Sequence, residues 1–236
     1  MTLHILSAGA AKGLVGALAG EFERATGHDI AGAFGAIGAM REKYLAGERC
    51  DTIILSAAMI RELAAAGEVN PESIADLGRV RTGVAVPAGA ALPAVGDAAQ
   101  LREALARARA VYFPDPQRAT AGIHFMKVLG ELGLAQALGE RLRAFPNGAT
   151  AMAEMARAVQ AGELAPADAI GVTQVTEILY TPGVQLVAPL PAQFELATVY
   201  TAAVTRRAAD PALAARLVAL LSGPQSAPVR AAGGFE

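Results

Sequence analysis

The chain has 236 residues, of which 53% are hydrophobic and 18% charged, so we predict a globular protein of one large domain or two small ones and exclude a disordered chain. The net charge is −2 and no block of like charge occurs, which gives no indication of a nucleic-acid partner or a membrane surface. There is no Trp and only 5% of the residues are aromatic, which argues against a platform for stacking sugars or bases.

The single cysteine, Cys50, excludes an intramolecular disulfide and a metal site built from several cysteines. It precedes an apolar strand-like run, so we predict a buried structural thiol. No stretch approaches the roughly 20 apolar residues of a membrane-spanning helix, so we expect no membrane insertion. The first residues lack a basic segment followed by a long apolar core, so we expect no signal peptide in this chain. The expected compartment is the periplasm if a signal peptide has been trimmed, and the cytoplasm otherwise.

Near its start the chain repeats one pattern, in which a short apolar strand runs into a turn of small residues that opens into a helix. The first copy has its strand at Leu3–Leu6 and its turn at Ser7–Ala10. The second has its strand at Ile30–Phe34 and its turn at Gly35–Gly38. Small residues let a ligand approach the backbone, and a helix start presents unpaired N–H groups with partial positive charge. Two such turns on neighbouring parallel strands would make a cleft suited to an anionic or strongly polar small molecule.

The same alternation of strand and helix continues along the chain. Expected strands are 52–55, 80–86, 110–113, 141–145, 169–173, 184–187 and 194–204, and expected helices include 98–108 and 211–221. Strands separated by helices imply βαβ units, so the predicted class is α/β with a mostly parallel sheet. Ligands of such sheets bind at the carboxyl ends of the strands. The last residues, with Gly233 and Gly234, are expected to form a frayed tail.

Several segments, taken together in their order and spacing, resemble one family along nearly the whole chain. They are LHILSAGAAKGLVGALAGEFERATGHDI, FGAIGAM, LAGERCDTIILSAAMIRELAAAGEV, VRTGVAVPAG, ATAGIHFMKVLGELGL, NGATAMAEM and DAIGVTQVTEI. These segments are similar to the type 2 periplasmic binding proteins, in particular to the branch that contains the molybdate-binding components of ABC transporters.

This resemblance implies two lobes joined by two crossing strands, with helices on both faces of mixed, mostly parallel sheets and a cleft between the lobes that closes by hinge motion. Lobe 1 would be residues 1–83 plus 200–236, and lobe 2 residues 84–199. The crossing strands would lie near Thr82–Val86 and Leu196–Thr201.

The residues that the family uses to hold molybdate are not kept here. The resemblance places the serine of the first turn at Ala10, the serine of the second turn at Ile37, and a tyrosine at Gln174. An isoleucine in place of a hydroxyl donor removes a hydrogen bond and adds apolar bulk. We therefore expect a ligand with a carboxylate head and an apolar body rather than molybdate.

Polar residues beside the predicted junctions have two interpretations each. Ser7 and Ser56, at strand ends, either contact the ligand or make local turn or capping hydrogen bonds. Thr120 and Asn147 precede helices and are either N-caps or part of helix starts that donate to a carboxylate. Arg81 either pairs with a carboxylate or lies on a solvated strand face.

His124 lies in the first turn of a predicted helix, and with Glu177 it would make an acid–base pair for proton abstraction or isomerisation. A surface or packing role is the alternative. With three scattered histidines, no metal site and no cofactor are expected. The full set of predicted ligand-binding residues is Ser7, Ala8, Gly9, Ala10, Gly35, Ala36, Ile37, Ser56, Arg81, Thr120, Ala121, Gly122, His124, Asn147, Gly148 and Gln174.

Two functions remain open at this point. The first is a solute-binding protein that captures a small anion, expected to be a carboxylate, and delivers it to an ABC permease. The second is a cytoplasmic isomerase, tautomerase or lyase of a small carboxylate on the same fold, with His124 and Glu177 as candidate catalytic residues.

Overall fold

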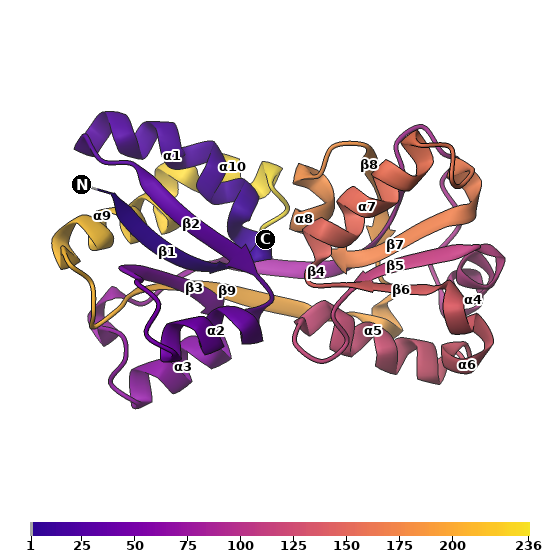
Figure 1. Ribbon diagram of the computed structural model, residues 1–236, viewed down its shortest axis with the longest axis horizontal. Coiled ribbons are helices and arrows are strands. Elements are labelled where there is room, and N and C mark those ends of the chain that lie inside the picture. The colour runs from indigo at the N-terminus through magenta and orange to yellow at the C-terminus, as the bar shows by residue number, and fades with distance from the viewer. Residues whose placement is uncertain (1) are drawn as a thin grey trace. The chain divides into compact units, whose positions relative to one another are not determined.

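The computed structural model describes residues 2–236 and divides into two compact units (Figure 1). Unit 1 comprises the residues up to Val80 together with Thr198–Glu236, and unit 2 comprises Arg81–Ala197. Both are α/β, as predicted. In residues 2–236, no helix combines the length and the apolar character needed to span a membrane.

Unit 1 is built on a sheet with strand order β2-β1-β3-β9. The strands β1 (Leu3–Ala8), β2 (Ile30–Gly35) and β3 (Thr52–Ser56) are parallel, and β9 (Ala197–Val204) runs antiparallel to β3. Its helices cover both faces of the sheet, with α1, α9 and α10 on one side and α2 and α3 on the other (Figure 1). Their bounds are α1 Lys12–Thr26, α2 Ile37–Leu45, α3 Ala57–Ala65, α9 Pro211–Ser222 and α10 Ala227–Ala232.

Apolar spacing explains why α1 forms and where it ends. Leu14, Leu18 and Phe22 lie on one face at helical spacing and are all buried. The helix ends at Gly27, which adopts the left-handed conformation at φ 75° and donates its N–H to the Glu23 carbonyl. The α1 helix thus begins and ends close to the residues that the sequence indicates.

Unit 2 is built on a sheet with strand order β8-β4-β7-β5-β6. The strands β5, β6 and β7 are parallel, and β4 runs antiparallel to β7 and β8. The bounds are β4 Ala75–Pro87, β5 Ala110–Pro114, β6 Leu142–Phe145, β7 Ala169–Gln174 and β8 Val184–Pro189. The helices are α4 Ala98–Arg107, α5 Thr120–Glu131, α6 Ala135–Leu138, α7 Gly148–Gln160 and α8 Val175–Tyr180.

Unit 2 has two apolar clusters. One joins β-strand residues such as Val111 to Leu105 of α4 and Phe125 of α5. The other joins Tyr112 to Met152 of α7 and to the α8 helix. Neighbouring residues Val111 and Tyr112 belong to different clusters because successive strand side chains point to opposite faces. Helices therefore cover both faces of the sheet, and its strands β5 and β7 are buried throughout.

The prediction of a frayed C-terminal tail is wrong. The backbone of Glu236 exchanges hydrogen bonds with Arg79, N to O and O to N, both at 2.8 Å. The Phe235 ring is buried and lies edge-to-face against Tyr200, with ring centroids 6.4 Å apart. A Cβ at Gly78, where φ is 139°, would come within 3.1 Å of Phe235. One apolar residue after the glycines thus anchors the tail to the start of β4.

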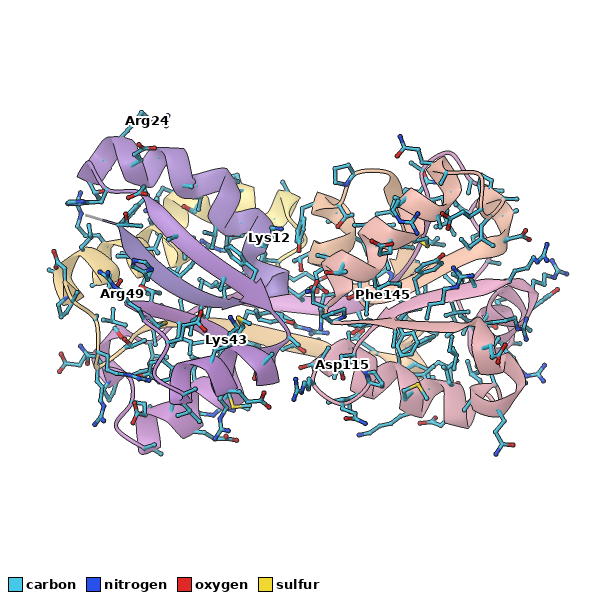
Figure 2. All side chains as sticks on the ribbon, in the orientation of Figure 1. Lys12, Arg24, Lys43, Arg49, Asp115 and Phe145 are labelled. Atoms are coloured by element: carbon cyan, nitrogen blue, oxygen red, sulfur yellow. The ribbon has the colours of Figure 1, made fainter. Side chains whose placement is uncertain are left out.

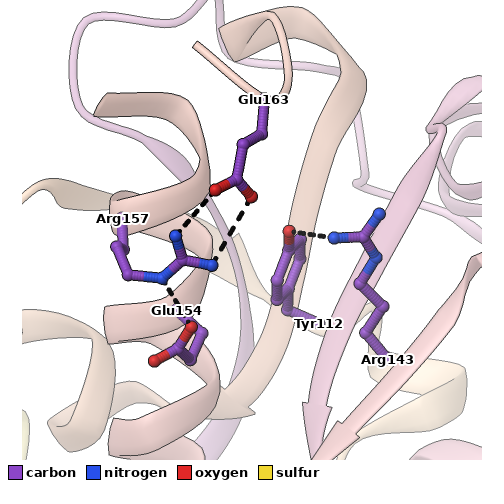
Figure 3. A network of polar contacts seen from close by, with 5 residues as sticks. All are labelled: Tyr112, Arg143, Glu154, Arg157 and Glu163. Carbon is purple, nitrogen blue, oxygen red and sulfur yellow. Dashed lines mark hydrogen bonds and ion pairs between the residues drawn. The ribbon is translucent and has the colours of Figure 1, made fainter. Parts of the chain in front are cut away.

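The outer face of α7 carries a network of charged side chains (Figure 3). Arg157 donates to Glu154 from Nε and to Glu163 from Nη1, each at 2.8 Å, and these carboxylates raise the pKa of Arg157. Beside them Arg143 donates to the Tyr112 hydroxyl at 2.9 Å. Exposed ion pairs of this kind contribute little to stability. The cluster therefore belongs to the solvated surface of unit 2.

Candidate functional site

In unit 1 the two small-residue turns lie side by side, as predicted, because Ala8 at the end of β1 pairs with Gly35 at the end of β2. The first turn, Gly9–Ala11, forms a single 3-10 turn that is entirely buried. The Ser7 hydroxyl, also buried, donates to the Ala8 carbonyl at 2.9 Å. The interpretation of Ser7 as a residue with a local turn hydrogen bond is confirmed.

The second turn brings Ala36 and Ile37 to the start of α2, where both are buried and Ala36 provides no side-chain cap. A Cβ at Gly35 would come within 2.8 Å of Met40 Cε, so a larger residue there would displace the end of the Met40 side chain. Ala10 is likewise buried, and none of residues 8–10 and 35–38 has a polar side chain. These residues can therefore make polar contacts to a ligand only through their backbone.

Ser56 ends β3 at the same edge, and its hydroxyl accepts a hydrogen bond from Met59 N at 3.4 Å. The capping interpretation of Ser56 is thus confirmed. Lys12, labelled in Figure 2, is exposed at the first residue of α1.

In unit 2 the junction between β5 and α5 differs from the prediction by one residue. Thr120 is the first residue of α5, and Ala119, which has no capping oxygen, is the N-cap. The interpretation of Thr120 as the cap is wrong. Ala121 and Gly122 are buried, and a Cβ at Gly122 would lie 2.7 Å from the carbonyl carbon of Asp115, labelled in Figure 2. Only a glycine lets α5 pack this closely on the end of β5.

His124 lies half-buried in the first part of α5, with Nε2 2.8 Å from the Phe194 carbonyl oxygen. Because a carbonyl only accepts, Nε2 is the donor of this hydrogen bond. His124 and Glu177 were predicted to act as a pair, but the hydrogen bonds of these two side chains in residues 2–236 are to other groups: His124 to the Phe194 carbonyl and Glu177 to the Thr173 hydroxyl.

The N-terminus of α7 is fully capped. Asn147 accepts hydrogen bonds from Thr150, at 2.9 Å from N and 3.0 Å from Oγ1, so its interpretation as an N-cap is confirmed. The N–H groups of Gly148 and Ala149 donate to the carboxyl group of Glu177. The start of α7 is therefore an anion-binding site that already holds a carboxyl group of the chain itself.

Glu177 on α8 is 5% exposed. Burial raises the pKa of its carboxyl group, against the hydrogen bonds that it accepts. These come from the Thr173 hydroxyl at 2.6 Å and from the backbone N–H groups of Gly148, Ala149 and Gln174. Glu177 thereby ties the β7–α8 junction to the start of α7.

Gln174, the last residue of β7, is 3% exposed, and neither Nε2 nor Oε1 has a hydrogen-bond partner within residues 2–236. Its neighbour across the sheet is Thr82 of β4, whose buried hydroxyl also has no partner among the described residues. The hydroxyl of Thr176 is in the same situation. Buried polar groups are almost always satisfied, so this cluster is the strongest candidate for contact with a ligand.

The sequence does not indicate Thr82 or Thr176 as site residues, and it indicates Gln174 only through the family resemblance. Strand pairing, which places Thr82 opposite Gln174, cannot be inferred from their distant positions along the chain. Arg81, adjacent to Thr82, is half-buried on β4.

Other features of the structure do not belong to this cluster. A cavity of about 400 Å³ in unit 2 is lined mostly by apolar residues, among them Leu92, Ala169 and Ile170. Ala169 and Ile170 begin β7, so the cavity lies at the sheet edge opposite Gln174. Among residues 2–236, no group of three or more His, Cys, Asp or Glu side chains is placed to hold a metal ion.

The doubly covered sheets, with small-residue turns at the carboxyl ends of their strands, define a type 2 periplasmic binding protein that resembles the molybdate-binding branch. The family model for bacterial extracellular solute-binding proteins matches residues 3–236, so the chain belongs to that family.

The individual relatives have names that state different activities or ligands. The chain is 27% identical to an aconitate isomerase from a Pseudomonas species over 96% of this chain and 84% of that protein. The periplasmic molybdate-binding protein of Azotobacter vinelandii matches 99% of this chain and 98% of its own, with TM-score 0.76 and 22% identity. The sulfate-binding protein SubI of Mycobacterium tuberculosis matches 100% and 86%, with TM-score 0.72 and 17% identity. The two solved structures show the likeness of the fold.

Proposed function

We propose that this protein binds a small organic carboxylate, rather than molybdate, and delivers it to an ABC permease. The observation that carries the proposal is the buried amide of Gln174, which has no partner within the described chain. A buried polar group left unsatisfied costs about 1–3 kcal/mol. A ligand that hydrogen-bonds to this amide removes that cost. An amide donates and accepts, which suits a carboxylate accompanied by a hydroxyl or a second, protonated carboxyl group.

The turns of unit 1 support a ligand that is not an inorganic oxyanion. Buried Ala10 and Ile37 occupy the positions that the family resemblance gives to hydroxyl donors. Their apolar side chains suit the carbon skeleton of an organic acid, while the backbone N–H groups of these turns remain suited to its negative charge. Membership of an extracellular family supports the periplasm as the compartment.

Thermal unfolding with and without candidate ligands tests this function. Aconitate, citrate and succinate are compared with molybdate, tungstate and sulfate, since a ligand at 100 times its Kd stabilises the folded state by about 2.7 kcal/mol. We expect at least one carboxylate to raise the Tm and the inorganic anions to have no effect. A Tm that rises only with molybdate, tungstate or sulfate would overturn the proposal.

Paired variants locate the site. Gln174→Leu removes the unpartnered amide and should abolish the carboxylate response. Gln185→Leu is the matched control, because the Gln185 amide donates to the Ala90 carbonyl at 2.9 Å and should affect stability without affecting ligand binding.

A second function, isomerisation of a small carboxylate, is favoured by the 27% identity to an aconitate isomerase over nearly the whole chain. Aconitate is an unsaturated tricarboxylic acid, and moving its double bond requires removal and return of a proton. Nδ1 of His124, the ring nitrogen that does not bond to the Phe194 carbonyl, is the candidate base. Incubation with cis- or trans-aconitate in D2O should then give the other isomer with deuterium incorporated, and His124→Gln should bind but not convert it. If no carboxylate is ever converted, the binding function stands alone.

A further inference from the structure

The two long helices that start at the carboxyl edge of the unit 2 sheet differ in how their N-termini are capped. Both α5 and α7 follow parallel strands, and the ends of these strands pair, Pro114 with Phe145. The N-cap of α5 is Ala119, which offers no side-chain oxygen. The start of α7, by contrast, is satisfied by side chains of the protein.

The N–H groups at the start of α7 can be accounted for one by one. Gly148 and Ala149 donate to the Glu177 carboxyl group, and Thr150 donates to Asn147 Oδ1 at 2.9 Å. The next N–H, of Ala151, enters the regular helix by donating to the Asn147 carbonyl at 3.0 Å. No donor of this turn remains for an external anion.

The close packing around Gly148 also leaves no room for an external anion at the start of α7. A Cβ added at Gly148 would lie 2.7 Å from the Glu177 carboxyl carbon and would overlap the Thr173 hydroxyl. The carboxyl group therefore fills the volume directly in front of the helix start. Glu177 also accepts a hydrogen bond from the Gln174 backbone, so it fixes the junction that carries the unpartnered Gln174 amide.

We propose that Glu177 is a specificity-determining residue, whose carboxyl group closes the N-terminus of α7 to ligands, so that a ligand's carboxylate is held at the unpartnered amide of Gln174 instead. This inference rests on the proposed binding function for its biological meaning. A tetrahedral dianion, which needs donors on several sides, loses the donors of α7. A planar carboxylate needs fewer donors and is accommodated.

The test is chemical rescue of Glu177→Ala with formate, the smallest carboxylate. The substitution leaves the N–H groups of Gly148 and Ala149 and the Thr173 hydroxyl around an empty space, so formate should bind there and raise the Tm. At ten times its Kd the expected rise is about 3–6 °C over sodium chloride of equal ionic strength. Sulfate should also stabilise this variant. Wild type and Glu154→Ala, which removes a partly exposed carboxylate from α7, should show neither response.

A folded Glu177→Ala variant that responds to formate and sulfate no more than wild type would overturn the proposal. If the variant folds only when formate is present, the proposal is supported. If it folds in neither condition, Glu177→Gln decides the matter through amide hydrogen exchange. The amides of Gly148 and Ala149 should then exchange at least about 10-fold faster than in wild type, with Thr150, held by Asn147, unchanged; unchanged rates at all of these amides would overturn the proposal.

Formate rescue does not depend on the natural ligand. A successful rescue with no carboxylate bound by wild type would contradict the proposed function alone. Carboxylate binding by wild type without rescue would contradict the role of Glu177 alone.

Discussion

Gly148→Ala should destabilise the protein, although helix propensity alone predicts that it stabilises α7. Alanine normally favours a helix over glycine by about 1 kcal/mol. At this position, however, the new Cβ would lie 2.7 Å from the Glu177 carboxyl carbon and closer still to Thr173 Oγ1. Ordinary carbon contacts are about 3.5–4.0 Å, so the carboxyl group must move away from the helix start.

The expected cost follows from these contacts. Overpacking in a well-packed interior costs about 1–3 kcal/mol. Displacing the Glu177 carboxyl group also weakens its hydrogen bonds from Gly148 and Ala149, and a hydrogen bond to a charged group contributes about 1.5–3 kcal/mol. With one such bond lost, the free energy of unfolding should fall by about 4 kcal/mol. For a chain of this size that corresponds to a Tm lower by about 8–16 °C.

Urea unfolding followed by circular dichroism measures this change, with Gly130→Ala as the matched control. Gly130 lies inside α5 in the same unit, and a Cβ there meets nothing within 4 Å. That variant should be unchanged or more stable, by up to about 1 kcal/mol. A Gly148→Ala protein within about 1 kcal/mol of wild type, while Gly130→Ala behaves as expected, would refute the close packing of Gly148 on Glu177.

Three further predictions concern buried groups. Burial raises the pKa of the Glu177 carboxyl group above its ordinary value of 4.5, so the folded state binds the carboxyl proton more tightly than the unfolded state does. The free energy of unfolding should therefore fall as pH rises from 4.5 through the folded pKa, by at most about 1.4 kcal/mol per pH unit. Glu177→Gln should lack this pH dependence. Burial raises the pKa of the Cys50 thiol to about 12, so a thiol reagent at pH 8 should label native protein very slowly and urea-unfolded protein fast; equal rates would contradict the buried thiol. Phe235→Ala should lower the unfolding free energy by about 3 kcal/mol in urea titrations, whereas Leu92→Ala, at an exposed site, should change it by less than about 0.5 kcal/mol.

The sequence predicts the helices and strands well where apolar spacing determines them. Leu14, Leu18 and Phe22 are buried as their spacing indicates, since burial of an apolar face needs only a periodic pattern. Capping is predicted for Ser56 and Asn147 and confirmed. The prediction of a cap at Thr120 is wrong, because Thr120 is already the first residue of α5 and Ala119 is the N-cap. Helix boundaries are harder to predict from a sequence than the helices themselves.

Contacts between distant segments could not be predicted. Gly233 and Gly234 predict a frayed tail, but the two residues after them are ordered by long-range contacts. Phe235 is buried, and the backbone of Glu236 forms hydrogen bonds with that of Arg79. The donors that surround Glu177 come from α7 as well as from its own junction, and Thr82 faces Gln174 only through strand pairing. Long-range pairing of this kind has no local signal in a single sequence.

In the proposed function, this difference allows the scaffold of the family to persist while its ligand changes. The turns at Ala10 and Ile37 hold an anion, in the proposed function, through backbone N–H groups that any small or apolar residue leaves intact. Such donors attract negative charge but barely distinguish one anion from another. Discrimination between anions then depends on the few side chains that add or remove hydrogen-bond donors. In the proposed function these are the unpartnered amide of Gln174 and the carboxyl group of Glu177. In the proposed function, a change at either residue should therefore alter which anion binds.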